Sequence, residues 1–212
     1  ELGLVGSEMC IRDRFTTLLG FETAGQIIIT DQNITVDSGT VSVDNANLLD
    51  ATTTGIVTAS INTTETVDEL KTLAAGNNAY TIVIASGDAT GTTASELNTI
   101  NAATSVAIDA SAVTGLASDT VSNIKTLLTA GNDTDQFTST SFSSLATAVV
   151  SDSSLSVADL TGAIDQANTA TGGTSTVFSL NSGATINGGT ASDFTSLLAN
   201  ETASQVSITD QN

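Results

Sequence analysis

Acidic side chains are the residues of this chain best suited to chemistry. Asp133 and Asp135 follow a Gly-Asn pair, and Asp31 and its later counterpart Asp210 each begin an Asp-Gln-Asn sequence. Carboxylate oxygens are the ligands that calcium prefers in proteins. These four aspartates are therefore candidate calcium ligands, although none belongs to a complete calcium-binding loop motif. The alternative, which the residues leave open, is that they form Asx turns at the ends of loops.

The side chains on which most enzymes depend are absent. The chain has no His and no Trp, and its one Cys is Cys10. Nucleophile systems that need His, and most transition-metal sites, are therefore excluded. The glycine pairs at 172–173 and 188–189 lack the pattern that cradles a dinucleotide. A close pair of carboxylates is expected among so many acids, but no Trp is present to stack on a sugar. We predict that the chain is not an enzyme and has no cofactor, with calcium the one ion that its residues favour.

The charge of the chain excludes two classes of partner. There are 23 acidic and 4 basic residues, which give a net charge of −19. Binding to nucleic acid or to an anionic membrane requires clustered Lys and Arg. The sequence also has no apolar run close to the roughly 18 residues that a membrane span requires. We therefore expect no nucleic-acid partner and no membrane insertion.

The first fourteen residues differ in composition from the rest. They contain the only Met, the only Cys and both Arg residues of the chain. Their end, from Met9 to Arg14, resembles the translation of a transposase adapter that is used in DNA sequencing. We interpret residues 1–14 as a non-native segment derived from such an adapter. The alternative is a genuine N-terminal arm.

A long internal repeat defines the remaining chain. Residues 15–33 return as residues 194–212 with 13 of 19 positions identical, at an offset of 179. Such a period indicates a repeat protein. We predict that residues 15–212 form a single domain that amounts to about one 179-residue super-repeat, cut from a longer chain. Neighbouring repeats of the same chain are then its expected partners.

Helices are predicted where a Thr or Ser precedes an acid by three residues. The hydroxyl can accept a hydrogen bond from a free N–H group of the first turn, and the acid favours the positive helix end. Helix starts of this kind are predicted at Thr66, Thr93, Ser156 and Thr190. Weaker signals predict helices over 44–53, 119–129 and 143–150. Lys71 and Lys125 occupy the same position of two similar helices and are expected to be a repeated surface feature.

Short β-rich bursts follow most of these helices. They cover 55–61, 80–85, 105–109, 176–180 and 205–209, with extra apolar stretches at 34–43 and 184–188. Strands that alternate with helices over short connections are typical of parallel pairing. The sequence therefore predicts an α/β solenoid of stacked helix–strand coils, with a parallel β-sheet on one side and short helices on the other. A globular α/β domain is the alternative.

The repeated units resemble those of a known class of protein. Residues 93–100, 54–61 and 156–160 resemble repeats of very large secreted or cell-surface, adhesin-like proteins of marine bacteria, including picocyanobacteria. The resemblance implies a secreted or cell-surface location and a structural or adhesive role, as a stalk or spacer. A module that binds a glycan or calcium on one solenoid face is the alternative function, with cell-surface glycans as partners.

Overall fold

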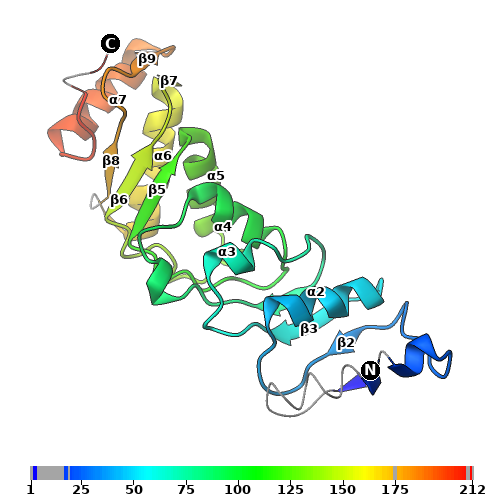
Figure 1. Cartoon of the computed structure of the whole chain (residues 1–212). Coiled ribbons are helices and arrows are strands. Elements are labelled where there is room, and N and C mark those ends of the chain that lie inside the picture. The colour runs from blue at the N-terminus through cyan, green and yellow to red at the C-terminus, as the bar shows by residue number, and fades with distance from the viewer. Residues whose placement is uncertain (1, 4–16, 19, 174–175, 209–210, 212) are drawn as a thin grey trace.

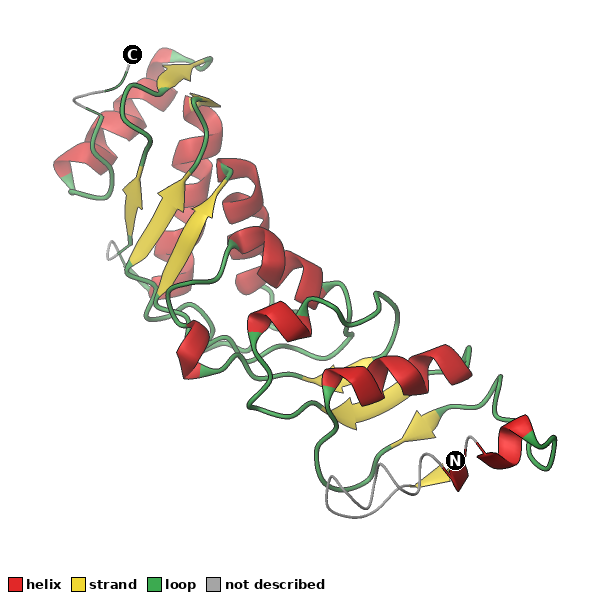
Figure 2. Cartoon of the chain, in the orientation of Figure 1, coloured by secondary structure: helices red, strands yellow, loops and turns green. Residues whose placement is uncertain are grey.

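The molecule is elongated, with helices stacked beside short strands along its length (Figures 1 and 2). The computed structural model describes residues 2–3, 17–18, 20–173, 176–208 and 211. Strand β2 lies near one end and helix α7 near the other, so successive elements follow the long axis (Figure 1). No described helix is long and apolar enough to cross a membrane.

The helices begin where capping residues predict them. Thr66, Thr93, Ser156 and Thr190 are all N-caps, and each side chain accepts a hydrogen bond from the N–H group three residues later. The predicted helix starts are therefore confirmed. The helices are α2 (Val43–Thr52), α3 (Val67–Leu70), α4 (Ala94–Asn101), α5 (Val121–Gly131), α6 (Val157–Thr171) and α7 (Ala191–Thr202), with a short 3-10 helix, η1 (Ser86–Asp88).

Every strand pairing among the described residues is parallel. One sheet has the order β1 (Leu2–Gly3), β2 (Ile34–Thr35), β3 (Val57–Ser60) and β4 (Ala79–Thr81). A second contains β5 (Gly115–Asp119), β6 (Thr147–Val150) and β8 (Val177–Ser179), and a third pairs β7 (Ser154–Ser156) with β9 (Thr185–Asn187). The predicted mixed α/β class with parallel sheets is confirmed. The strands do not form one continuous sheet, however, but three small ones.

Between β4 and β5 along the chain lies a predicted β-rich burst that does not form a strand. The burst at 105–109 makes only single parallel bridges, Val83 with Asp109 and Ile108 with Phe137. Beside it, the N–H group of Ala110 donates to the Ser141 hydroxyl rather than to a backbone carbonyl. A hydroxyl that takes the place of a backbone partner interrupts the ladder that defines a strand.

The helix predicted over 143–150 is wrong. Residues 147–150 form strand β6, which lies between β5 and β8. Phe142, just before this segment, has a φ of 59° and is fully buried, so the chain turns there instead of entering a helix. Gly131 ends α5 beside it, and a Cβ atom on Gly131 would come within 2.6 Å of the Phe142 ring. The glycine is therefore required by packing.

The core is narrow and mostly aliphatic, and it runs through all three sheets as one cluster. Its largest fully buried side chains include the aromatic residues Tyr80, Phe137, Phe142 and Phe178. The rings of Phe137 and Phe142 pack at a tilt with centroids 5.1 Å apart. Strand β1 belongs to the segment 1–14, whose interpretation as non-native remains a prediction.

Candidate functional site

Asp133 and Asp135 lie together in an exposed turn after α5. One Asp133 carboxylate oxygen accepts from the N–H group of Asp135 at 3.0 Å, and the other accepts from the Gln136 side chain at 3.0 Å. These hydrogen bonds, that from Gln136 first, lower the pKa of Asp133. The carboxylate therefore closes an Asx turn, which is the alternative that the sequence leaves open.

The other two calcium candidates are not joined to this turn. Asp31 is exposed and accepts a hydrogen bond from the side chain of its neighbour Gln32. Asp210 lies outside the described residues. In the part of the chain that the structure describes, no three His, Cys, Asp or Glu side chains come together in a way that could hold a metal ion.

The two lysines of the chain have equivalent partners. Lys71, which follows α3, contacts Glu96 of α4 at 2.8 Å, and Lys125 of α5 contacts Asp159 of α6 at 3.0 Å. Each acid is the third residue after the N-cap of its helix. Each lysine therefore joins its helix to the first turn of the following one, as a repeated feature would.

These contacts shift the titration of the acids. Partial burial opposes the charge of Glu96, but hydrogen bonds from Lys71 and Thr93 outweigh it and lower its pKa. The pKa of Asp159 is lowered by hydrogen bonds from Lys125 and Ser156. The pKa of Lys71 is raised by its hydrogen bonds to Asp68 and Glu96. Glu96, Asp159 and Lys71 are thus held in their charged forms at neutral pH.

A second set of acids caps helices from a distance in sequence. Asp88 accepts from the N–H group of Val67 at 3.2 Å, and Asp119 accepts from that of Ser95 at 2.6 Å. Asp152 accepts from the N–H group of Val121 at 2.7 Å. Each bond joins the first turn of one helix to a residue 21 to 31 positions later. Each acid therefore satisfies an N–H group that the preceding helix leaves free.

Sequence reasoning missed this second set. A weak signal was present, because each of the three aspartates lies one to five residues before the next N-cap, as Asp119 lies directly before Thr120. Nothing local, however, shows that such an acid reaches back to the preceding helix.

Hydroxyl and amide side chains make similar contacts near the strands. The Thr104 hydroxyl accepts from the N–H group of Tyr80 at 2.9 Å, and the buried Ser141 and Thr176 hydroxyls donate to the carbonyls of Ile108 and Leu145. The amide oxygen of buried Asn78 accepts from the N–H group of Val57 at 2.9 Å. Many of the Thr, Ser and Asn residues of this chain thus satisfy backbone groups 21 to 33 positions away.

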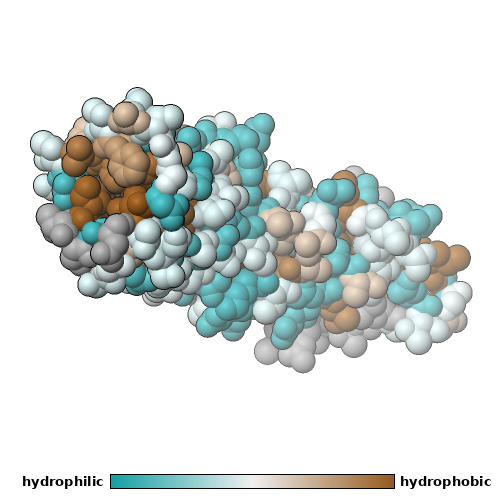
Figure 3. Space-filling view, turned by 90° about the horizontal axis from the view of Figure 1, so that it is seen from above, coloured by the Kyte–Doolittle hydropathy of each residue, from teal (hydrophilic) through white to brown (hydrophobic). Residues whose placement is uncertain are grey.

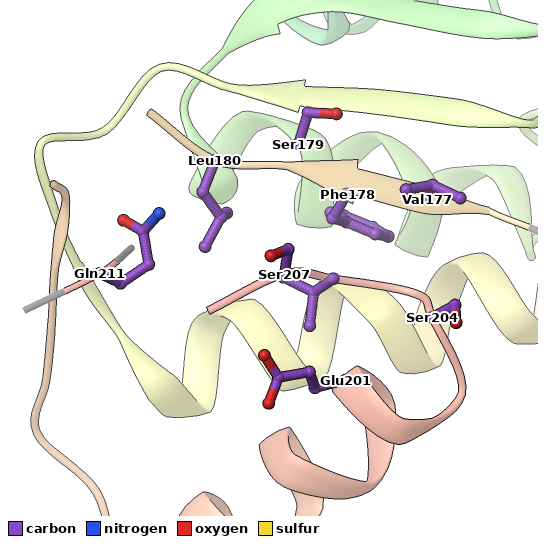
Figure 4. A pocket seen from close by; sticks show the side chains of 9 residues that line it. Val177, Phe178, Ser179, Leu180, Glu201, Ser204, Ser207 and Gln211 are labelled. Carbon is purple, nitrogen blue, oxygen red and sulfur yellow. The ribbon is translucent and has the colours of Figure 1, made fainter. Parts of the chain in front are cut away.

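An open hollow of about 650 Å³ lies at the α7 end of the molecule (Figure 4). Val177, Phe178 and Leu180 form one wall, and Glu201 and Ser207 lie opposite (Figure 4). One Glu201 carboxylate oxygen accepts from the N–H group of Ile208 at 3.1 Å. The hollow is lined by apolar and polar side chains together, and its polar lining residues are Ser179, Glu201, Ser204, Ser207 and Gln211.

Comparison with known proteins adds no relative: no family model matches the chain, and no curated protein or solved structure is significantly similar to it.

Proposed function

We propose that this chain is a structural segment, a stalk or spacer, of a large secreted or cell-surface protein. In this proposal the α/β architecture is a solenoid: each helix with its following strand is one coil, and successive coils stack along the long axis. The role is mechanical: the segment holds other modules at a distance from a surface.

The observation that supports this proposal most strongly is the direction of the polar contacts. Asp88, Asp119 and Asp152 each cap the preceding helix, and Lys71 and Lys125 each reach the following one. In an enzyme, polar side chains of this kind would converge on a cleft. In this chain they join each coil to its neighbour. Contacts restricted to nearest neighbours are typical of stacked repeats.

Scattering in solution tests the extended shape. A compact domain of 212 residues would have a radius of gyration of about 17 Å. We expect small-angle X-ray scattering of the chain to give a clearly larger value, with a maximum dimension that increases when a second copy is added. A radius close to that of a compact particle would contradict the spacer.

The alternative function is a module that binds a glycan or calcium on one face. The turn with Asp133 and Asp135 is the place to test for calcium, because both carboxylates are exposed. A ligand that binds only the folded state raises the melting temperature in proportion to the logarithm of its concentration. An increase with millimolar calcium that a chelator reverses, and that Asp133→Ala abolishes, would favour this alternative over a purely structural role.

A further inference from the structure

Helix α7 leaves apolar side chains exposed that equivalent helices bury. The fourth and eighth residues after the N-cap are apolar in α5, α6 and α7. In α5 and α6 these positions hold Ile124, Leu128, Leu160 and Ile164, all with no exposed surface. In α7 they hold Phe194, which is 41% exposed, and Leu198, which is 55% exposed.

The difference follows from the number of neighbouring helices. Helix α5 packs between α4 and α6, and α6 packs between α5 and α7. Helix α7 packs on α6, and no other described helix has a comparable contact with it. Viewed from this end, the molecule shows apolar atoms gathered within a polar rim (Figure 3). Phe194 and Leu198 therefore occupy positions that a further helix would cover.

The hollow of Figure 4 adjoins α7, since Glu201 of this helix lines it. Val177 is 42% exposed there, and Leu180 is partly buried against the core. Ser207 and Gln211 belong to the last described segment, which makes a single parallel bridge to β8 through Val206. We call Phe194, Leu198, Val177, Leu180, residues 205–208 and Gln211 the C-terminal face.

The internal repeat shows what covers the equivalent segment elsewhere. Residues 205–212 correspond to residues 26–33, which include Gln32 and Asn33. In that first copy the N–H group of Thr54 donates to the carbonyl of Thr30 at 2.7 Å, and the N–H group of Ile56 donates to the Asn33 side chain at 2.8 Å. Between them lies Gly55, where a Cβ atom would come within 2.3 Å of the Gln32 carbonyl oxygen.

This established contact therefore specifies its partner closely. It is made by two threonines, a glycine with no room for a side chain, and the N–H group of the next residue, as found in Thr53-Thr54-Gly55-Ile56. The Thr53 hydroxyl also donates to the Gln32 carbonyl. Gln211 occupies the position of Gln32 in the second copy of the repeat and lines the open hollow.

We propose that the C-terminal face is the docking site for a second copy of residues 34–61, which follows in the same polypeptide one 179-residue period later. The Thr-Thr-Gly-Ile sequence of that copy binds at Gln211, and its helix, equivalent to α2, covers Phe194 and Leu198. The inference rests on the proposed spacer role and names the contact by which one super-repeat continues into the next.

A two-copy protein tests this docking. It consists of residues 1–212 followed directly by a second copy of residues 34–212, which preserves the period. Hydrogen exchange is measured for the amides of α7 and of residues 205–208 in the single-copy and two-copy proteins. We expect exchange in the two-copy protein to be at least tenfold slower at these amides of the first copy. Unchanged exchange there would overturn the proposal.

Substitutions separate docking from a general gain in stability. Phe194→Ser with Leu198→Ser, made in the first copy only, should lower the stability of the single-copy protein only modestly, because Phe194 is 41% and Leu198 55% exposed there. In the two-copy protein the same pair should abolish the slower exchange. Ala199→Ser, at an exposed position of the same helix, is the matched control and should change neither protein.

The glycine contact provides an independent variant. Gly55→Ala made only in the second copy should remove the protection of residues 205–208, because the added Cβ would clash with the carbonyl of Gln211. If residues 205–208 of the first copy remain protected in this variant, the contact geometry taken from residues 26–56 is contradicted.

These experiments distinguish a failure of the docking proposal from a failure of the spacer proposal. If the maximum dimension increases with the second copy while α7 exchanges as before, the spacer stands and the docking site is overturned. If the dimension does not increase, the spacer is contradicted whatever α7 does. If the single-copy chain forms dimers that the Phe194 and Leu198 substitutions abolish, while two copies give no protection, the face is a self-association surface and the proposal is overturned.

Discussion

At the scale of single residues, the structure depends on acids that serve the backbone. Asp119 is the clearest example, because it is only 9% exposed and accepts three hydrogen bonds. Its carboxylate receives the N–H groups of Ser95 and Thr120 and the side-chain amide of Asn123. One side chain therefore joins the first turn of α4 to the first turn of α5.

Replacing this acid should lower stability markedly. Asp119→Ala leaves the N–H groups of Ser95 and Thr120 without their acceptor, and we expect a loss of about 3 kcal/mol in the free energy of unfolding, measured with urea. Asp119→Asn keeps one acceptor oxygen and should cost less. Asp165→Ala, at an exposed position of α6, is the control and should change stability by no more than about 0.5 kcal/mol. Equal effects at the two sites would contradict this role of Asp119.

The ion pair of Glu96 should make stability depend on pH. The pKa of Glu96 is lower in the folded chain than its ordinary value of 4.5. A group with a lowered folded pKa stabilises the fold above its unfolded pKa, and this contribution is lost as the pH falls through the folded value. Glu96→Gln should therefore be less stable than the wild type at pH 7.

The two proteins should converge in stability as the pH falls from about 4.5 through the lower pKa that Glu96 has in the folded chain, because the carboxyl group of the wild type becomes protonated there. Comparison of the two chains at each pH removes the effect of the large net negative charge, which changes in both. A difference in the free energy of unfolding that stays constant from pH 7 to pH 3 would show that the charge of Glu96 contributes nothing.

At the scale of elements, the helices differ in how much of each is buried. Helix α5 has five buried side chains, namely Val121, Ile124, Leu127, Leu128 and Ala130, whereas α7 has only Leu197. Both begin with a threonine N-cap, so capping does not account for the difference. Most of the stability of a helix in a protein comes from the packing of its apolar face.

Hydrogen exchange of the backbone amides should differ between α5 and α7 for the same reason. We expect the amides of α5 to exchange close to the rate of global unfolding and those of α7 to exchange much faster, by local opening. Hydrogen exchange of the single-copy chain measures both at once. Similar protection in the two helices would mean that α7 is stabilised by contacts other than those seen in the structure.

At the scale of the whole molecule, removal of residues 1–14 tests whether this segment contributes to the stability of the fold. Its one described element, β1, pairs with β2 over two residues only. If the segment is non-native, a chain that begins at Phe15 should melt within about 2 °C of the full chain, since such a change alters stability by at most about 0.5 kcal/mol. A decrease of many degrees, measured by calorimetry, would identify a genuine N-terminal arm.

The sequence by itself determined the local features. N-caps at Thr66, Thr93, Ser156 and Thr190, the parallel α/β class and the likeness of residues 15–33 to 194–212 all follow from short patterns, because capping and repetition depend on neighbouring residues. Only the tertiary structure decided three other features: the strand at 147–150, the three separate sheets, and the reach of Asp119 to the preceding helix. These depend on side chains more than 20 residues apart, and no local pattern records which of them meet.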